Sequence, residues 1–267
     1  GPFVGGLLAD TFGYRNVFFI TSVMCLVSGI LVLLFVKEAN VSRNKESDIW
    51  DNYRFVLQNT RLKYAIILLI ISAAAISMVQ PLFALFIEGR VSDLTYLATI
   101  TGSIFGVVGL FQVISSSFWG KLNDRRDIRK NLIFAMVGAG VGYALHVVTT
   151  GIWELVPIRA LLGLCIGGLM PSLFSFINKC IPAQKKGGIM GIASSFTMFG
   201  NLIGPISSGY IASYTSINFV FVLSGVILAA GAVLEYYKLK ETPNSKRMIT
   251  DKDKSVIKEE IAAGAFE

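Results

Sequence analysis

Charged residues are scarce in this sequence. Aspartate, glutamate, lysine and arginine together make up 15% of its 267 residues, whereas apolar residues make up 54%. Soluble globular domains usually carry about 25% charged residues. So little charge beside so much apolar sequence excludes an ordinary water-soluble domain.

Histidine and cysteine are also rare, which limits the chemistry available to the chain. There is one histidine, His146, and the three cysteines Cys25, Cys165 and Cys180 lie far apart. The sequence contains no zinc-site spacing, no CxxC pair, no phosphate-binding loop and no HExxH motif. One histidine also gives no Ser-His-Asp set. We therefore expect neither an enzyme nor a bound metal or cofactor, and we interpret His146 and the cysteines as structural residues.

Long apolar runs take the place of these missing features. A helix needs about 20 mostly apolar residues to cross a bilayer, and seven runs are about that long. Strands of a membrane barrel would alternate apolar and polar residues, which these runs do not do. The sequence therefore predicts an all-α membrane protein in contact with the lipid bilayer. Its helices are expected at about 17–36, 64–87, 97–118, 131–149, 155–177, 188–212 and 219–236.

Lysine and arginine alternate between the predicted loops. On this topology 21 of the 24 fall on one side of the membrane, and the others are Arg15, Arg90 and Arg159. Cytoplasmic loops collect Lys and Arg, so we expect a multi-pass protein of the cell (inner) membrane with its C-terminus in the cytoplasm. The same distribution explains the net charge of +7 without nucleic acid, which we do not expect the chain to bind.

One long polar segment, 37–63, separates the predicted helices and is interpreted as a cytoplasmic linker. Its second part, from Ile49, could form a short helix on the membrane surface; a solvated connector is the alternative. The charged segment 241–267 is expected to be a cytoplasmic tail. Glu88, Glu154 and Glu235 are expected at helix ends, within reach of water.

Two segments about 203 residues apart resemble each other. Each ends a helix on the outer side, turns and starts the next helix. A repeat of this length implies two halves of six helices, and parallel repeats of this kind occur in the major facilitator fold. The two segments begin Gly1-Pro2-Phe3-Val4-Gly5-Gly6 and Gly204-Pro205-Ile206-Ser207-Ser208-Gly209.

Three motifs make the sequence resemble the major facilitator superfamily, in particular its drug:proton antiporter branch of multidrug efflux proteins. Gly1-Pro2-x-x-Gly5-Gly6 resembles the end of the antiporter motif of helix five. Arg159-x-x-x-Gly163 in helix ten resembles the R-x-x-x-G pattern of helix four. The loop after helix eight resembles G-x-L-x-D-R, although one residue is then added and the next Gly is missing. That loop reads Gly120-Lys121-Leu122-Asn123-Asp124-Arg125.

The resemblance implies the C-terminal part of a 12-helix major facilitator fold, from the end of helix 5 through helices 6–12. Residues 1–36 would hold the end of helix 5 and helix 6, and 37–63 the linker. The segment 64–240 would form the C-terminal six-helix bundle, followed by the tail. Because the chain starts inside an apolar stretch without Met, we expect an N-terminal truncation, either of the sequence or of the gene itself.

Helices seven, eight, ten and eleven line the substrate cavity of the resembled fold. Arg159 is the most informative residue there, because an arginine near the bilayer centre costs about 2.5–3.5 kcal/mol on insertion scales. It is expected to face a water-filled cavity or a partner; reaching toward the outer surface is the alternative. Aromatic and Met walls with a few amides suit bulky apolar or cationic substrates. The candidate cavity residues are Gln80, Phe83, Gln112, Arg159, Met170, Phe174, Met198 and Asn201.

A second group of residues is expected to let the helices rock between two states. Glycine allows two helices to approach closely, and proline bends a helix. Asp124 is expected beside the start of helix eleven, near Gly187 and Gly188. The group comprises Gly1, Pro2, Gly5, Gly6, Gly120, Asp124, Arg125, Gly163, Gly204, Pro205 and Gly209.

These expectations combine into a secondary active transporter that exports bulky small molecules by alternating access. The resemblance implies a proton as the coupling ion, with its site on helices one to five, and a monomer when full length. A carrier for a metabolite or sugar, and a non-functional transporter remnant, remain alternatives. A channel would need a charged or carbonyl-rich ring motif, and the sequence shows none.

Overall fold

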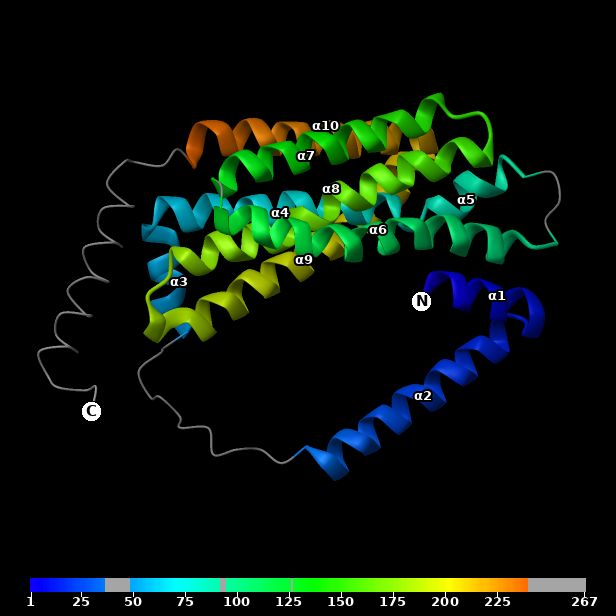
Figure 1. The fold of residues 1–267 in the computed structure, drawn as a ribbon, viewed down its shortest axis with the longest axis horizontal. Helices are drawn as coiled ribbons and strands as arrows, with labels where there is room; N and C mark the ends of the chain where they lie inside the picture. The colour runs from blue at the N-terminus through cyan, green and yellow to red at the C-terminus, as the bar shows by residue number, and fades with distance from the viewer. Residues whose placement is uncertain (37–48, 92–94, 126, 240–267) are drawn as a thin grey trace, which may run out of the picture.

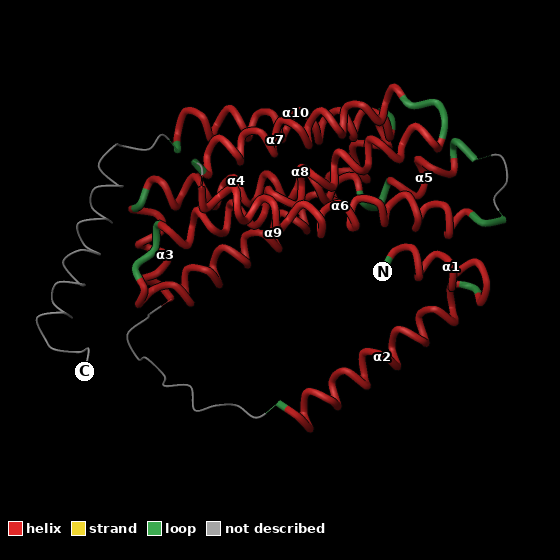
Figure 2. Tube along the Cα trace, in the orientation of Figure 1, coloured by secondary structure: helices red, strands yellow, loops and turns green. Residues whose placement is uncertain are grey.

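The structure, a computed structural model, describes residues 1–36, 49–91, 95–125 and 127–239 (Figure 1). All regular structure in these ranges is helical, as Figure 2 shows. Seven helical spans among them are long and apolar enough to cross a membrane. These spans are Tyr14–Phe35, Thr60–Glu88, Leu97–Arg125, Ile128–Val148, Ile152–Lys179, Lys186–Tyr214 and Ile217–Lys238.

Each span coincides with one predicted apolar run, so the all-α membrane fold is confirmed. The helices extend beyond the apolar runs, however. Helix α6 (Leu97–Arg125) passes residue 118 and includes the loop motif in its last turns. Helix α4 (Thr60–Val79) begins before residue 64 because Asn59 caps it, accepting hydrogen bonds from the N–H groups of Arg61 at 3.1 Å and Leu62 at 3.3 Å. A helix continues through polar residues as long as its backbone hydrogen bonds remain intact. Helices predicted from hydropathy alone are therefore too short.

The second span is broken into α4 and the short helix α5 (Phe83–Glu88). The break falls at Gln80–Leu82, around Pro81. Proline has no N–H to donate, and its ring clashes with the carbonyl one turn earlier. Phe83 therefore opens a six-residue helix that is joined to α4 only through a turn.

Helices α4, α6, α8 (Ile152–Lys179) and α9 (Lys186–Tyr214) form the middle of the bundle. Helices α7 (Ile128–Leu145) and α10 (Ile217–Lys238) pack against each other and against α8 and α4 (Figure 1). The short helices lie at opposite ends: α3 (Ile49–Gln58) marks one, here named the α3 end, and α5 marks the other, the α5 end (Figure 1). Helix α1 (Pro2–Phe12) lies along α6, and α2 (Tyr14–Phe35) has no buried residue.

Small residues allow the central helices to approach closely. A Cβ added at Gly163 of α8 would lie 2.5 Å from the carbonyl oxygen of Val108 of α6, and one at Gly204 of α9 equally close to that of Ala74 of α4. Both crossings are also bridged by a serine. Ser115 Oγ donates to the Gly163 carbonyl at 3.4 Å, and Ser77 Oγ donates to the Gly200 carbonyl at 3.5 Å. Helix pairs in lipid associate through this kind of backbone approach and hydrogen bonding.

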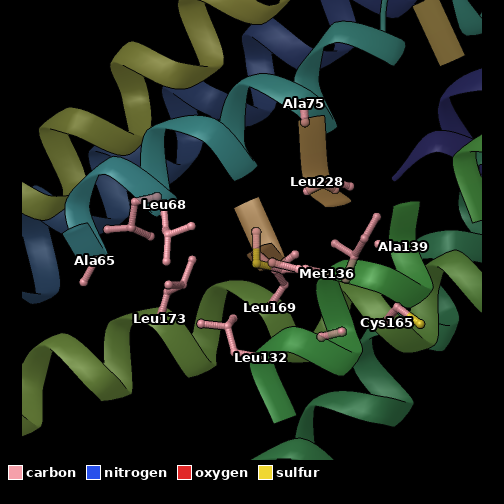
Figure 3. Packing of buried hydrophobic residues seen from close by; sticks show 14 of the residues in the cluster. Ala65, Leu68, Ala75, Leu132, Met136, Ala139, Cys165, Leu169, Leu173 and Leu228 are labelled. Atoms are coloured by element: carbon pink, nitrogen blue, oxygen red, sulfur yellow. The ribbon is translucent and has the colours of Figure 1, made fainter. Parts of the chain in front are cut away.

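The core between α4, α7, α8 and α10 is apolar and tightly packed. Figure 3 shows Leu68, Met136, Leu169 and Leu228 converging from these four helices, and all four are fully buried. Lipid tails are as apolar as leucine, so this core gains from close packing more than from leaving water. A polar group placed inside it is costly unless it is hydrogen-bonded or paired.

Candidate functional site

Arg159 lies inside the bundle near the α5 end, with 3% of its surface exposed. Its guanidinium carbon is 3.4 Å from the ring centre of Phe83 on α5 and 5.6 Å from that of Phe105 on α6. Nε and Nη2 have no hydrogen-bond partner. Among the described residues, Arg129 and Glu235 are close enough to form an ion pair. No carboxylate in the same ranges is that close to Arg159. The arginine is a buried cation held against aromatic faces.

A cluster of aromatic rings beside this cation joins α5 to α10. Phe86 of α5 lies beneath Arg90, 3.6 Å from guanidinium carbon to ring centre, and stands 4.6 Å from Phe221 of α10 between ring centres. The imidazole of His146 lies 4.9 Å from Phe221. Because a carbonyl only accepts, Nδ1 of His146 donates to the Gly142 carbonyl at 2.8 Å. The fully buried His146 thus lies in an aromatic setting, consistent with the expected structural role.

The predicted cavity residues are spread over α5, α6, α8, α9 and the break between α4 and α5. Phe83 and Arg159 meet directly, as described above. Met170 and Phe174 of α8 are half-buried against the apolar core, and Gln112 of α6 is also half-buried. The remaining three are exposed: Gln80 at the helix break, and Met198 and Asn201 on α9. Only the pair formed by Arg159 and Phe83 therefore builds a defined local site.

The Gly-Pro motif at the start of the chain is the contact surface between α1 and α6. A Cβ at Gly6 would clash with the Ala98 backbone, and one at Gly102 would clash with the Pro2 carbonyl. Gly6, Gly163 and Gly204 thus each serve a close helix approach. A Cβ would meet open space at the other predicted glycines, Gly1, Gly5, Gly120 and Gly209.

Asp10 adds a polar contact that the sequence analysis did not identify. Its carboxylate accepts hydrogen bonds from the N–H groups of Ala98 at 3.3 Å and Thr99 at 2.6 Å. These N–H groups are in the first turn of α6, where no intrahelical acceptor is available. The carboxylate of α1 therefore caps α6, a helix far from it in the sequence.

The predicted loop motif, which forms the last turns of α6, is anchored by its asparagine. Asn123 is buried, and its Nδ2 donates to Ser172 Oγ at 2.7 Å, while its Oδ1 accepts from Asn131 Nδ2 at 3.0 Å. This network joins α6, α7 and α8. Asp124 and Arg125 are exposed.

A different residue occupies the place expected for Asp124. The side-chain amide of Asn52, on α3, lies against Gly188 at the start of α9. Asn52 and Val56 are the buried residues of α3, so this helix docks on the bundle through them. This part of the predicted linker is helical, as one of the two sequence interpretations had it, and it packs on the bundle. Residues 37–48 and the tail from 240 lie outside the described residues.

Glu235 corrects one sequence expectation. We expected it within reach of water at a helix end, but its side chain is fully buried in α10. Neither of its oxygens has a hydrogen-bond partner, and its nearest cation is Arg129 of α7, with Nε 4.0 Å from Oε1. Glu235 lies three residues before the end of α10 at Lys238. Only the packing of α7 against α10 encloses its side chain.

The seven spans, the broken second span and the glycine-lined crossings define a multi-pass α-helical membrane protein. The profile of the Major Facilitator Superfamily matches residues 1–111 and 65–263, and the chain belongs to this superfamily. The fold resemblance drawn from the motifs is therefore confirmed.

The chain is also similar to several curated proteins of this type. It is 29% identical over 238 residues to the uncharacterized MFS-type transporter YuxJ of Bacillus subtilis, covering 88% of this chain and 60% of that protein. It is 28% identical to the multidrug resistance protein MdtG of Serratia proteamaculans and 29% identical to that of Proteus mirabilis. Each of these two matches covers 92% of this chain and 61% of the relative. The chain thus spans about 60% of the length of the relatives it matches.

Proposed function

We propose that the complete protein is a secondary active transporter that exports bulky small molecules by alternating access. The observation that carries the proposal is the pair of glycine-lined crossings, α6 with α8 and α4 with α9, within a superfamily fold. Close backbone approach without bulky interlocking side chains suits helices that slide and tilt against each other. The break between α4 and α5 adds a second movable element.

The substrates are proposed to be bulky and largely apolar. The names of the MdtG relatives describe multidrug resistance proteins. In this chain the candidate residues include aromatic rings, the sulfur of Met170 and the amide of Gln112, a composition that suits varied apolar molecules. A metabolite or sugar carrier would need more polar groups around its substrate. A non-functional remnant remains the alternative if no complete reading frame exists.

Proton coupling, a monomeric state, insertion in the inner membrane and a cytoplasmic C-terminus belong to the same proposal. We place the coupling carboxylate on the other half of the transporter. Glu235 is buried, but it pairs with Arg129 near the α3 end, whereas Phe83 and Arg159 lie near the α5 end. The C-terminal part of α10, which carries Glu235, thus lies away from the proposed substrate contacts.

A dye-efflux experiment tests this function. The complete reading frame that encodes this chain is expressed in a bacterium lacking its own major pumps, and the cells are loaded with a lipophilic fluorescent dye. We expect energised cells to export the dye and a protonophore to stop the export. A Gly167→Leu variant, which places a side chain against α6, should insert in the membrane but export poorly. Wild-type protein that is present in the membrane yet exports no dye would refute the proposal.

A further inference from the structure

The guanidinium of Arg159 lacks hydrogen-bond partners at two of its three nitrogens, and these two lie on the same edge of the group. Its aromatic neighbours offset part of the charge through their ring faces, but a ring face does not replace hydrogen-bond acceptors at every N–H. The unpaired nitrogens are Nε and Nη2. These two nitrogens form one edge of the planar group, and their N–H bonds point in parallel. A carboxylate fits such an edge with two parallel hydrogen bonds.

The ring against the face of this guanidinium belongs to a short helix that follows a helix break. Phe83 is the first residue of α5, directly after the break at Gln80–Leu82. Helix α5 is held by ring contacts and by Arg90, whose Nη1 donates to the Phe86 carbonyl and Nη2 to the Thr149 carbonyl, both at 3.2 Å. Phe83 can therefore withdraw from Arg159 without breaking a continuous helix, since the backbone ladder is already interrupted there.

We propose that Arg159 and its aromatic cover are a binding site for the carboxylate of an amphipathic small molecule. The apolar part of the ligand would contact Phe105 and Phe83, and the acid group would take the free edge of the guanidinium. This inference rests on the proposed function and sharpens it. A buried cation without a counter-charge among the described residues repels cationic substrates and favours acids over neutral molecules of the same shape.

A matched pair of fluorescent probes tests the proposal. Dansyl-phenylalanine and its methyl ester share the same apolar body but differ in the carboxylate. The full chain is placed in lipid nanodiscs, and binding is followed by energy transfer from its tryptophans, among them Trp119 and Trp153. We expect the acid to bind about tenfold or more tightly than the ester, since a hydrogen bond to a charged group contributes about 1.5–3 kcal/mol.

Four variants separate a charge effect from a folding effect. Arg159→Gln should abolish the preference for the acid over the ester, and circular dichroism checks that the bundle is intact. Arg159→Lys should retain only part of the preference, because lysine keeps the charge but loses the two-pronged edge. Phe83→Leu should speed association of the acid by thinning the cover. Arg15→Gln, which removes an exposed charge from α2, should change nothing.

Each outcome decides between the two proposals. Equal binding of acid and ester to the wild-type chain, or a preference that survives Arg159→Gln, would overturn the carboxylate site and leave the apolar transporter standing. Such equality would point to a carboxylate of the protein itself as the partner of Arg159. Failure of both probes to bind would overturn the apolar site and, with it, the acid preference.

Discussion

Single glycines set how closely these helices approach, and the effect is most direct where two glycines face each other. Gly140 of α7 and Gly225 of α10 form such a pair. A Cβ at Gly140 would lie 2.9 Å from the Gly225 carbonyl oxygen, and one at Gly225 would lie 2.6 Å from the Gly140 oxygen. The obstacle is backbone, which cannot rotate away as a flexible side chain can.

Gly225→Val is therefore expected to lower the free energy of unfolding by about 1–3 kcal/mol, the usual cost of overpacking. Unfolding in detergent micelles, followed by circular dichroism, measures the change. Gly109→Val is the matched control, because a Cβ at Gly109 of α6 meets nothing within 4 Å and the helix-propensity cost is shared. Equal destabilisation by both variants would show that close approach is not the cause.

The buried pair of Arg129 and Glu235 gives a second prediction. Arg129→Leu leaves a carboxylate in the core without its cation, so we expect clear destabilisation, of up to about 3–5 kcal/mol for a fully buried pair. The double variant Arg129→Leu with Glu235→Leu should recover most of this loss. A double-mutant cycle of unfolding midpoints measures the coupling. Additive losses would mean that the 4.0 Å separation carries no interaction.

At the scale of whole helices, the contacts between helices matter more for the arrangement of the bundle than the apolar runs do. Helix α1 is joined to α6 by the glycine approach and by the Asp10 cap. The sequence resemblance implies that α1 belongs to the N-terminal half of a major facilitator fold and α6 to the C-terminal half. A contact between the halves at the α5 end must separate whenever that end opens, so its strength influences which state is populated.

Asp10→Ala is expected to weaken this joint by about 0.5–2 kcal/mol, the usual value of a helix N-cap. Spin labels at Leu7 and Leu110, both exposed, on a background without the native cysteines report the separation of α1 and α6. The distance distribution should broaden toward longer values in Asp10→Ala and much less in Asp10→Asn, which retains an acceptor oxygen. An unchanged distance distribution in Asp10→Ala would show that the Asp10 cap does not hold α1 close to α6.

At the scale of the molecule, the arrangement of charges predicts its orientation in the membrane. The last turns of α6 carry Lys121, Asp124 and Arg125 at the α3 end, whereas Trp153 lies at the opposite end of the bundle. If the basic loops are cytoplasmic, the two ends differ in access from outside the cell. Within the same turns, Asn123 is an unsuitable position for a cysteine that reports access from outside, because it is buried and hydrogen-bonded to Ser172.

We expect Lys121→Cys to be protected from a membrane-impermeant maleimide added to intact cells and Trp153→Cys to react. Both positions are exposed in the structure, so the membrane alone would account for the difference. Permeabilised cells, in which both should react, provide the control. Reaction of Lys121→Cys in sealed cells would reverse the proposed topology.

Much of this protein is determined by local sequence, because a bilayer demands long apolar helices and tolerates few other structures. The seven spans and the break at Gln80-Pro81 follow from that demand and from the missing N–H of proline. The close approach at Gly6, Gly163 and Gly204 follows from the absence of a side chain.

Contacts between distant segments were decided only by the tertiary structure. The Asp10 cap joins residues 88 and 89 positions apart, and Asn52 rather than Asp124 lies against Gly188. The burial of Glu235 depends on α7, and the cover of Arg159 depends on α5 and α6. Hydropathy and spacing describe one helix at a time, whereas the partner of a buried charge is set by which helices pack around it.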